Sequence, residues 1–198
     1  MGETERKEDD ATVDSAMLDS YRRYIAGDEG ALGEIVRAYS DSMILFTTSL
    51  VKNVSDAEEI VADAFVSIAV KKRAFRGDSQ LRTYLFAICR NRAIDLIRKN
   101  ASRGEIASLD PEQSADVETL EARVLRSERN AKLHAAIGEL CEEYRAALYL
   151  VYFEGMSHEE VAKAMKKSRK QTENVIFRAR RALRAILEKE GFTYEDLR

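Results

Sequence analysis

The chain has 198 residues, of which 34% are charged and 45% hydrophobic, with one proline and nine glycines. This composition favours helices over sheet and predicts an all-α fold. No run of about 18 apolar residues occurs, so we expect no transmembrane helix and no membrane contact. The first ten residues, MGETERKEDD, are charged where a secretory signal peptide would be apolar, which predicts a cytoplasmic protein.

The formal net charge of −3 conceals a segregation of charge along the chain. Residues 71–103 and 163–189 each hold ten Lys or Arg residues against two acidic residues. Residues 1–34 and 104–143 each hold four basic residues against ten acidic ones. Two basic modules in acidic surroundings indicate two separate contacts with a polyanion such as nucleic acid.

The N-terminal part of the chain predicts a bundle of amphipathic helices. Residues 1–14 are acidic and poor in large apolar residues, so we expect them to be disordered. A first helix is expected over 15–26, and a second over 28–52 with a broad apolar face that belongs in a core. Ser55 and Glu58 have the spacing of a capping box, which predicts the start of a third helix there.

The segment from Phe75 to Lys99 combines aromatic and cationic side chains. Its helix is expected to begin after Ser79, whose side chain can cap it. Aromatic rings can stack on unpaired bases while cations contact phosphates, so the segment has the chemistry of a single-stranded nucleic acid site. Each ring could instead belong to the core. The helical spacing of Phe86 favours the core, whereas Tyr84 fits either role.

The composition changes at residues 101–116 to small and acidic residues with the sole proline of the chain. We interpret this segment as a flexible acidic linker that joins two helical domains, at 15–100 and 117–190. The second domain is expected to open with a long acidic helix, followed by an apolar helix over 142–154. A short tail, 191–198, ends the chain.

The last two helices of the second domain have the pattern of a helix-turn-helix. Gly155 suits the left-handed residue that ends a helix. The pairs Ser157 with Glu160 and Ser168 with Gln171 have capping-box spacing, and each predicts a helix start. The second helix buries one stripe and exposes Lys, Arg and Asn, as a recognition helix does in the major groove. An amphipathic helix with solvated cations would give the same pattern.

With both modules laid out, the chain resembles the sigma-70 family of bacterial RNA polymerase initiation factors, specifically its small extracytoplasmic-function group. Three segments carry the resemblance: DAEEIVADAFVSIAVK at 56–71, FRGDSQLRTYLFAICRNRAIDLIRK at 75–99, and EGMSHEEVAKAM with TENVIFRARRALR within 154–184. In the family, the first segment grips the clamp helices of the largest polymerase subunit. The second melts and captures the −10 promoter element, and the third reads the −35 element. The match covers about 15–100 and 120–187.

The resemblance implies the residues of each contact. For the polymerase clamp they are Asp56, Glu59, Ile60, Asp63 and Phe65. For capture of the −10 element they are Phe75, Arg76, Asp78, Ser79, Arg82, Tyr84, Arg90, Asn91 and Arg98. For the −35 element they are Arg169, Lys170, Glu173, Asn174, Phe177, Arg178 and Arg181. The resemblance further implies that the second domain contacts the polymerase flap.

The implied partners are core RNA polymerase and promoter DNA. Members of the family are often held inactive by an anti-sigma protein wedged between their domains, and a flexible linker would permit such a partner here. No cofactor, metal or catalytic residue is expected, because the chain has two isolated histidines, no Cys/His cluster of zinc spacing and no glycine-rich phosphate loop. Cys89 and Cys141 are expected to be buried, reduced thiols.

A second hypothesis is a stand-alone helix-turn-helix regulator whose N-terminal half serves only for oligomerisation. The segment Phe75 to Lys99 distinguishes the two hypotheses. A dimerisation domain has no need for rings among cations, whereas a domain that captures a DNA strand does.

Four positions depart from the family pattern. Tyr84 stands where Trp is usual, which predicts a smaller stacking surface and weaker promoter melting. Lys166 or Lys167 replaces the usual glycine of the helix-turn-helix turn. Glu173 stands where a basic residue is common, so we expect a different −35 sequence. Cys141 replaces a frequent proline before a helix, a change that we expect to be tolerated.

Overall fold

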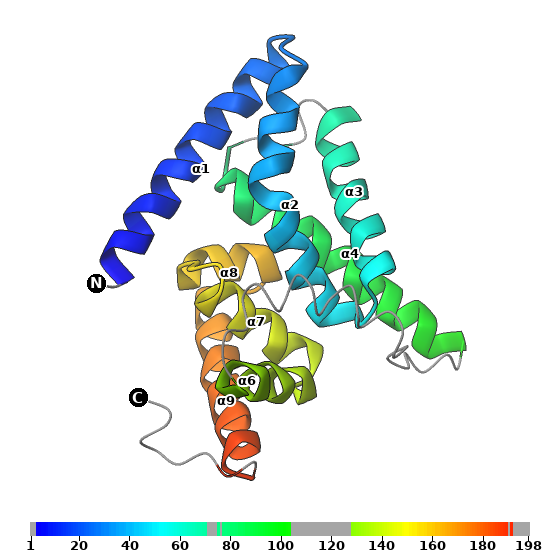
Figure 1. The fold of residues 1–198 in the computed structure, drawn as a ribbon, viewed down its shortest axis with the longest axis vertical. Helices are drawn as coiled ribbons and strands as arrows, with labels where there is room; N and C mark the ends of the chain where they lie inside the picture. The colour runs from blue at the N-terminus through cyan, green and yellow to red at the C-terminus, as the bar shows by residue number, and fades with distance from the viewer. Residues whose placement is uncertain (1–2, 71–74, 76, 104–127, 190, 192–198) are drawn as a thin grey trace.

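The computed structural model describes residues 3–70, 75, 77–103, 128–189 and 191. In these ranges it contains helices and turns but no strand, so the all-α prediction is confirmed (Figure 1). None of the described helices is long and apolar enough to cross a membrane. The described helices are α1 (Glu3–Ile25), α2 (Gly30–Val51), α3 (Val54–Val70), α4 (Leu81–Arg103), α6 (Glu128–Glu139), α7 (Glu142–Tyr152), α8 (His158–Met165) and α9 (Arg169–Lys189).

Helices α1 to α4 form the first bundle, with α2 between α1 and α3 and with α4 running behind them (Figure 1). The centre of α2 is apolar on the face that meets its neighbours, and Ile35, Met43 and Phe46 have no exposed surface. Leu85 and Phe86 of α4 close the same core and are equally buried. Each such side chain contributes about 1.5–3 kcal/mol through burial of apolar area.

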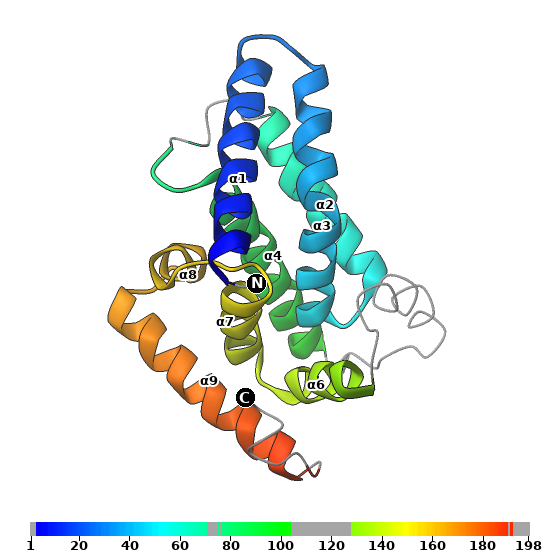
Figure 2. The ribbon, with the colours of Figure 1, turned by 60° about the vertical axis from the view of Figure 1, so that its left-hand side comes forward.

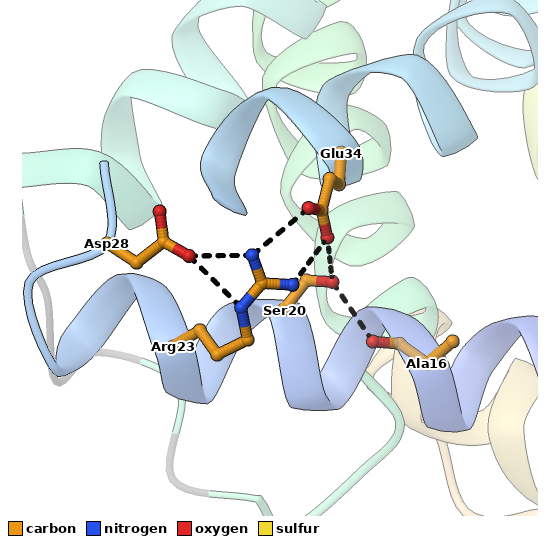
Figure 3. A network of polar contacts seen from close by, with 5 residues as sticks. All are labelled: Ala16, Ser20, Arg23, Asp28 and Glu34. Carbon is orange, nitrogen blue, oxygen red and sulfur yellow. Dashed lines mark hydrogen bonds and ion pairs between the residues drawn. The ribbon is translucent and has the colours of Figure 1, made fainter. Parts of the chain in front are cut away.

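A polar network fixes the turn between α1 and α2 (Figure 3). Gly27 has φ 112°, a conformation that favours glycine, and it reverses the chain. Arg23 donates to Oδ2 of Asp28 at 2.6 Å and to Oε2 of Glu34 at 3.1 Å, while Ser20 donates to the same Glu34 oxygen at 2.6 Å. The hydrogen bonds raise the pKa of Arg23, and they lower the pKa of Asp28 and of Glu34.

Both capping boxes predicted in the C-terminal helices are present. At the start of α8, the Ser157 hydroxyl accepts from the N–H of Glu160 at 3.3 Å, and the Glu160 carboxylate accepts from the N–H of Ser157 at 2.8 Å. At the start of α9, Ser168 and Gln171 make the same reciprocal pair, at 2.9 and 3.2 Å. Helices α8 and α9 pack against each other as the expected helix-turn-helix, and α7 packs behind them.

Two residues in left-handed conformation shape the helix-turn-helix. Gly155 has φ 63°, as predicted for the residue that ends the preceding helix. Lys166 has φ 53° and follows the last residue of α8. Lys166, and not Lys167, therefore occupies the left-handed position of the turn between α8 and α9, where a side chain costs about 1–2 kcal/mol relative to glycine.

Two predictions about the first helices were wrong. Residues 3–14, expected to be disordered, are the first half of α1. The end of this stretch is held by long-range contacts of Asp14 with α2 and α4, which composition does not reveal. The cap of α3 is Asn53 and not Ser55, because Oδ1 of Asn53 accepts from the N–H of Asp56 at 3.0 Å.

The boundaries of α4 also differ from the prediction. The helix was expected to begin at Gln80, but α4 begins at Leu81, and the Ser79 hydroxyl donates to the carbonyl of Gln80 at 3.2 Å. At its other end α4 continues to Arg103, beyond the expected start of the linker. The rest of the predicted linker, the first part of the predicted acidic helix and nearly all of the tail lie outside the described residues.

The two halves of the chain pack against each other through one continuous core, and both views show α7 and α8 beside the first bundle (Figures 1 and 2). The ring of Phe46 lies 5.3 Å from that of Phe86 and 5.4 Å from that of Tyr149 in α7. Arg145 of α7 donates to the carbonyl of Ser49 in α2 at 2.5 Å. The described conformation is therefore closed, with the second half seated on α2 and α4.

Candidate nucleic-acid interface

Helix α9 buries one face and exposes a basic one. Its inner face rests on α7 and α8 through buried Thr172, Val175, Ile176 and Ala179. The residues predicted to contact the −35 element are all exposed: Arg169, Lys170, Glu173, Asn174, Phe177, Arg178 and Arg181. The structure thus brings the whole predicted set onto one helix, where bidentate Arg and Asn side chains can reach purine edges.

Two residues of this set, Arg169 and Glu173, are hydrogen-bonded to each other. Arg169 donates to Oε1 of Glu173 at 3.1 Å and to Oε1 of Glu159 in α8 at 2.8 Å. The hydrogen bond that Arg169 donates to Glu173 is the largest cause of its raised pKa. The three side chains are exposed, so the pairs add little stability. Their effect is to orient the first residue of α9 against α8.

Exposed aromatic side chains accompany the cations of α9. Phe177 of α9 is 62% exposed. An apolar group on a recognition helix can contact the methyl group of thymine. Tyr152 of α7 is 51% exposed and lies under the guanidinium of Arg180, 5.3 Å from the ring centroid. Sequence periodicity alone did not single out this pair.

The rings proposed for base stacking form a cluster of their own. Phe75 lies between Tyr21 and Tyr84, and each pair of ring centroids is 5.5 Å apart. Tyr21 is buried, which raises the pKa of its hydroxyl, whereas Phe75 and Tyr84 are half-buried. Partial exposure leaves both candidate rings an accessible surface on which a base could stack.

The other residues predicted for the −10 element differ in accessibility. Arg76 lies outside the described residues. Asp78 and Arg98 are exposed, and Ser79, Arg90 and Asn91 are half-buried. Arg82 is buried, with 8% of its surface exposed. Arg90 is also partly withdrawn from solvent, and this burial lowers its pKa. The predicted set therefore does not form one open surface in this conformation.

Helix α8 covers part of the surface predicted to bind the −10 element. Lys163 of α8 donates to the carbonyl of Asp78 at 2.6 Å, and Thr83 of α4 donates to Oε1 of Glu160 at 3.5 Å. The helix-turn-helix half thus lies on the first turns of α4, where the predicted strand-capturing residues begin.

The predicted polymerase-binding helix needs a correction. Ile60 and Phe65 of α3 are 7% and 8% exposed and belong to the core, so they do not face a partner. Val66 and Val70, which the sequence reasoning missed, are 55% and 75% exposed. Val66 and Val70 are four residues apart and therefore lie on one face of the helix, away from the buried stripe. This spacing is the sequence pattern that could have identified them as surface residues.

The acidic residues predicted on α3 are accessible. Glu59 is exposed, while Asp56 and Asp63 are half-buried. Asp63 forms an ion pair with Arg92 of α4. The outer face of α3 is consequently acidic in its first half and apolar at its end.

Two family models match the chain, "Sigma-70 region 2" over residues 35–103 and "Sigma-70, region 4" over residues 130–183. The RNA polymerase sigma factor NccH of Alcaligenes xylosoxydans xylosoxydans is 32% identical over 183 residues, covering 90% of this chain and 97% of NccH. The ECF RNA polymerase sigma factor SigM of Bacillus subtilis is 26% identical over 155 residues, covering 78% of this chain and 94% of SigM.

A solved structure has a similar fold. CnrH, determined in complex with the cytosolic domain of CnrY, superposes with a TM-score of 0.64 at 26% identity. The superposition covers 88% of this chain and 97% of that one. The likeness therefore extends over both halves of the molecule.

Proposed function

The chain belongs to the sigma-70 family of RNA polymerase sigma factors, in its extracytoplasmic-function group, and we propose on that basis how its two halves divide promoter recognition. It is a transcription initiation factor that binds core RNA polymerase and directs it to promoters. We assign region 2 to residues 15–100 and region 4 to 117–190, joined by a linker at 101–116. The regulator hypothesis is not favoured, because the part it reserves for oligomerisation matches region 2.

Region 4 would bind the −35 element through α9. Asn174 and Arg178 are exposed and carry the groups that hydrogen-bond purine edges, and Phe177 beside them offers an apolar surface to a thymine methyl. Lys170, in the first turn, would contact phosphate and set the register of the helix. The exposed basic face of α9, within a matched region 4, is the observation that carries this assignment.

Region 2 would capture the opened −10 strand on α4 and its preceding loop. Tyr84 and Phe75 would stack on unpaired bases, and Arg98 would contact phosphate. Stacking contributes about 1–3 kcal/mol per base and offsets the unstacking of the duplex. Because Lys163 lies on Asp78, α8 must leave the start of α4 before a strand can occupy that surface.

The outer face of α3 would bind the clamp helices of the polymerase. Asp56, Glu59 and Asp63 would supply charge, and Val66 and Val70 an apolar contact at the end of the helix. Region 4 would contact the polymerase flap. Charge reversal at Glu59 is expected to weaken core binding at physiological salt, and unchanged binding would remove this helix from the interface.

Further properties follow from this assignment. The family consists of regulators of transcription, and we propose no catalytic activity for this chain. Its polymerase and promoter targets place it in the cytoplasm. A protein partner of anti-sigma type could stabilise the closed arrangement, since CnrH was solved with a bound protein, the cytosolic domain of CnrY.

The decisive experiment is co-elution of the full chain with purified core RNA polymerase, followed by selection of promoters from a random duplex library. We expect co-elution and enrichment of a sequence with two separated elements. Replacing Asn174 by Ala should then change the preference at one or two positions by about 1–3 kcal/mol, whereas Lys170→Ala should weaken all duplexes alike. A chain that binds duplex DNA but never the polymerase would contradict the proposal.

A further inference from the structure

A buried carboxylate of α1 lies where four helices of the closed molecule meet. Asp14 is 7% exposed. Its Oδ1 accepts a hydrogen bond from the Tyr39 hydroxyl of α2 at 2.7 Å, and its Oδ2 lies 3.3 Å from Nε of Arg82 in α4. Asp14 thus joins the N-terminal helix to the helix proposed to capture the −10 strand.

The same carboxylate is connected to region 4. When the amide of Gln80 is oriented as a donor, its nitrogen lies 2.6 Å from Oδ2 of Asp14 and 2.6 Å from Oε1 of Glu160. Glu160 is the residue that closes the capping box of α8. One amide therefore links the N-terminal helix to the first turn of the helix-turn-helix.

The pairing of Asp14 with Arg82 has the chemistry of a phosphate contact. A carboxylate presents charged acceptor oxygens to a guanidinium in the way that a phosphate does. Arg82 is only 8% exposed, so a DNA phosphate cannot reach it while Asp14 holds this position. A buried charge needs compensation, so loss of the Asp14 carboxylate would strengthen the attraction of Arg82 for another anion.

The pair is not sealed within a close-packed core. It borders a cavity of about 190 Å³ between α1, α2, α4 and the end of α7, lined also by Tyr39, Phe153 and Glu154. Among residues 12–19 of α1, Asp14 is the one buried side chain, whereas Ser20, Tyr21 and Tyr24 are buried in the second half of the helix. Displacing the turn that carries Asp14 would break its contacts with Tyr39 and Arg82, while Tyr21 can keep its place in the core.

We propose that Asp14 is an intramolecular substitute for a DNA phosphate, which occupies Arg82 in the free protein and must be displaced before Arg82 binds the −10 strand. The proposal rests on the proposed function, in that α4 is taken as the strand-capturing helix. It assigns to the N-terminal helix an inhibitory contact, and through Gln80 it couples that contact to the position of α8.

The test compares two full-length variants that change the net charge equally. Asp14→Asn removes the carboxylate that faces Arg82. Asp19→Asn, on the same helix, removes an exposed carboxylate that pairs with Arg22. Binding of a labelled single-stranded DNA oligonucleotide of mixed sequence is titrated over a range of salt concentrations. Asp14→Asn should bind about three- to tenfold more tightly than Asp19→Asn, and its salt slope should steepen by about 0.7, the value for one added phosphate contact.

A second comparison ties the effect to Arg82. In the Asp14→Asn background, Arg82→Gln should remove both the gain in affinity and the added slope. Equal affinities for Asp14→Asn and Asp19→Asn, or a gain that survives Arg82→Gln, would overturn the proposal. Thermal melting by circular dichroism checks folding. If Asp14→Asn does not fold, Tyr39→Phe weakens the hold on Asp14 at constant charge and should shift affinity in the same direction.

The outcome is separable from that of the proposed function. Co-elution of the unaltered protein with core polymerase tests the sigma factor assignment independently of Asp14. If co-elution fails, that assignment fails, while the DNA comparison still decides whether Asp14 competes for Arg82.

Discussion

Replacing Arg145 by methionine is expected to be strongly destabilising. Arg145 is 6% exposed, and burial lowers the pKa of its guanidinium. It donates to the carbonyls of Ile137, Gly138 and Leu140 at the end of α6, at 3.2, 2.7 and 2.5 Å, and to that of Ser49 in α2 at 2.5 Å. Arg145 thus pairs with carbonyls near the C-termini of two helices, where backbone donors run short. Two of these carbonyls have a second donor, since the N–H of Leu140 reaches Ile137 at 3.2 Å and Nζ of Lys52 reaches Gly138 at 3.1 Å.

The magnitude follows from these acceptors. A buried acceptor left without its partner costs about 1–3 kcal/mol. The carbonyls of Ile137 and Gly138 keep their second donors, so the cost falls mainly on the carbonyls of Ser49 and Leu140. Methionine keeps much of the apolar stem, so the packing loss is small. We therefore expect Arg145→Met to lower the free energy of unfolding by about 3–5 kcal/mol, the range for breaking a buried charged contact.

The assay is urea unfolding monitored by circular dichroism, with Arg22→Met as the control. Arg22 is exposed and pairs only with Asp19 one turn away, so its loss should cost less than about 0.5 kcal/mol. Because Ser49 belongs to region 2 and Arg145 to region 4, the variant should also loosen the two halves and increase the radius of gyration in solution scattering. Equal stability of the two variants would refute the conclusion that Arg145 stabilises the fold by hydrogen-bonding buried carbonyls.

Three further predictions concern single sites. Cys89 is fully buried, which raises the pKa of its thiol to about 12, whereas Cys141, which was expected to be buried, is exposed; a thiol reagent should therefore titrate one cysteine in the native protein and two in urea. Lys166→Gly should stabilise the protein by about 1 kcal/mol in thermal unfolding, because it relieves the left-handed conformation; destabilisation would show that the side chain is needed. Arg23→Gln should raise the pKa of Asp28 in an NMR titration. Since the folded pKa of Asp28 is lowered, the ion pair stabilises at neutral pH and is lost as the pH falls through that pKa, so variant and parent should converge in stability in acid.

Local signals in the sequence predicted local structure well. The capping boxes at Ser157 and Ser168, the left-handed Gly155 and the amphipathic stripe of α9 were all found as expected. Each depends on residues within one or two helical turns, where backbone geometry dictates which side chains meet. The set of exposed residues on α9 follows from the same periodicity.

Long-range contacts account for what the sequence did not predict. Helical order of residues 3–14 coincides with the contacts of Asp14, which reach partners 25 residues away in Tyr39 and beyond. The burial of Arg82, a cation on an otherwise plausible DNA surface, depends on the same contacts. Ile60 and Phe65 were misplaced because apolar residues on a helix next to acidic ones fit a partner surface and a core equally well.

The contact of Phe46 with Tyr149 in the shared core gives the closed molecule a dependence on temperature. Separating the halves would transfer these rings and their apolar neighbours to water, a change with a positive heat capacity. Apolar association weakens on cooling, whereas the hydrogen bonds of Arg145 do not share this dependence. The equilibrium between closed and open forms should therefore shift toward the open form in the cold. Less of the free energy of polymerase binding would then be needed to separate the two halves before promoter capture.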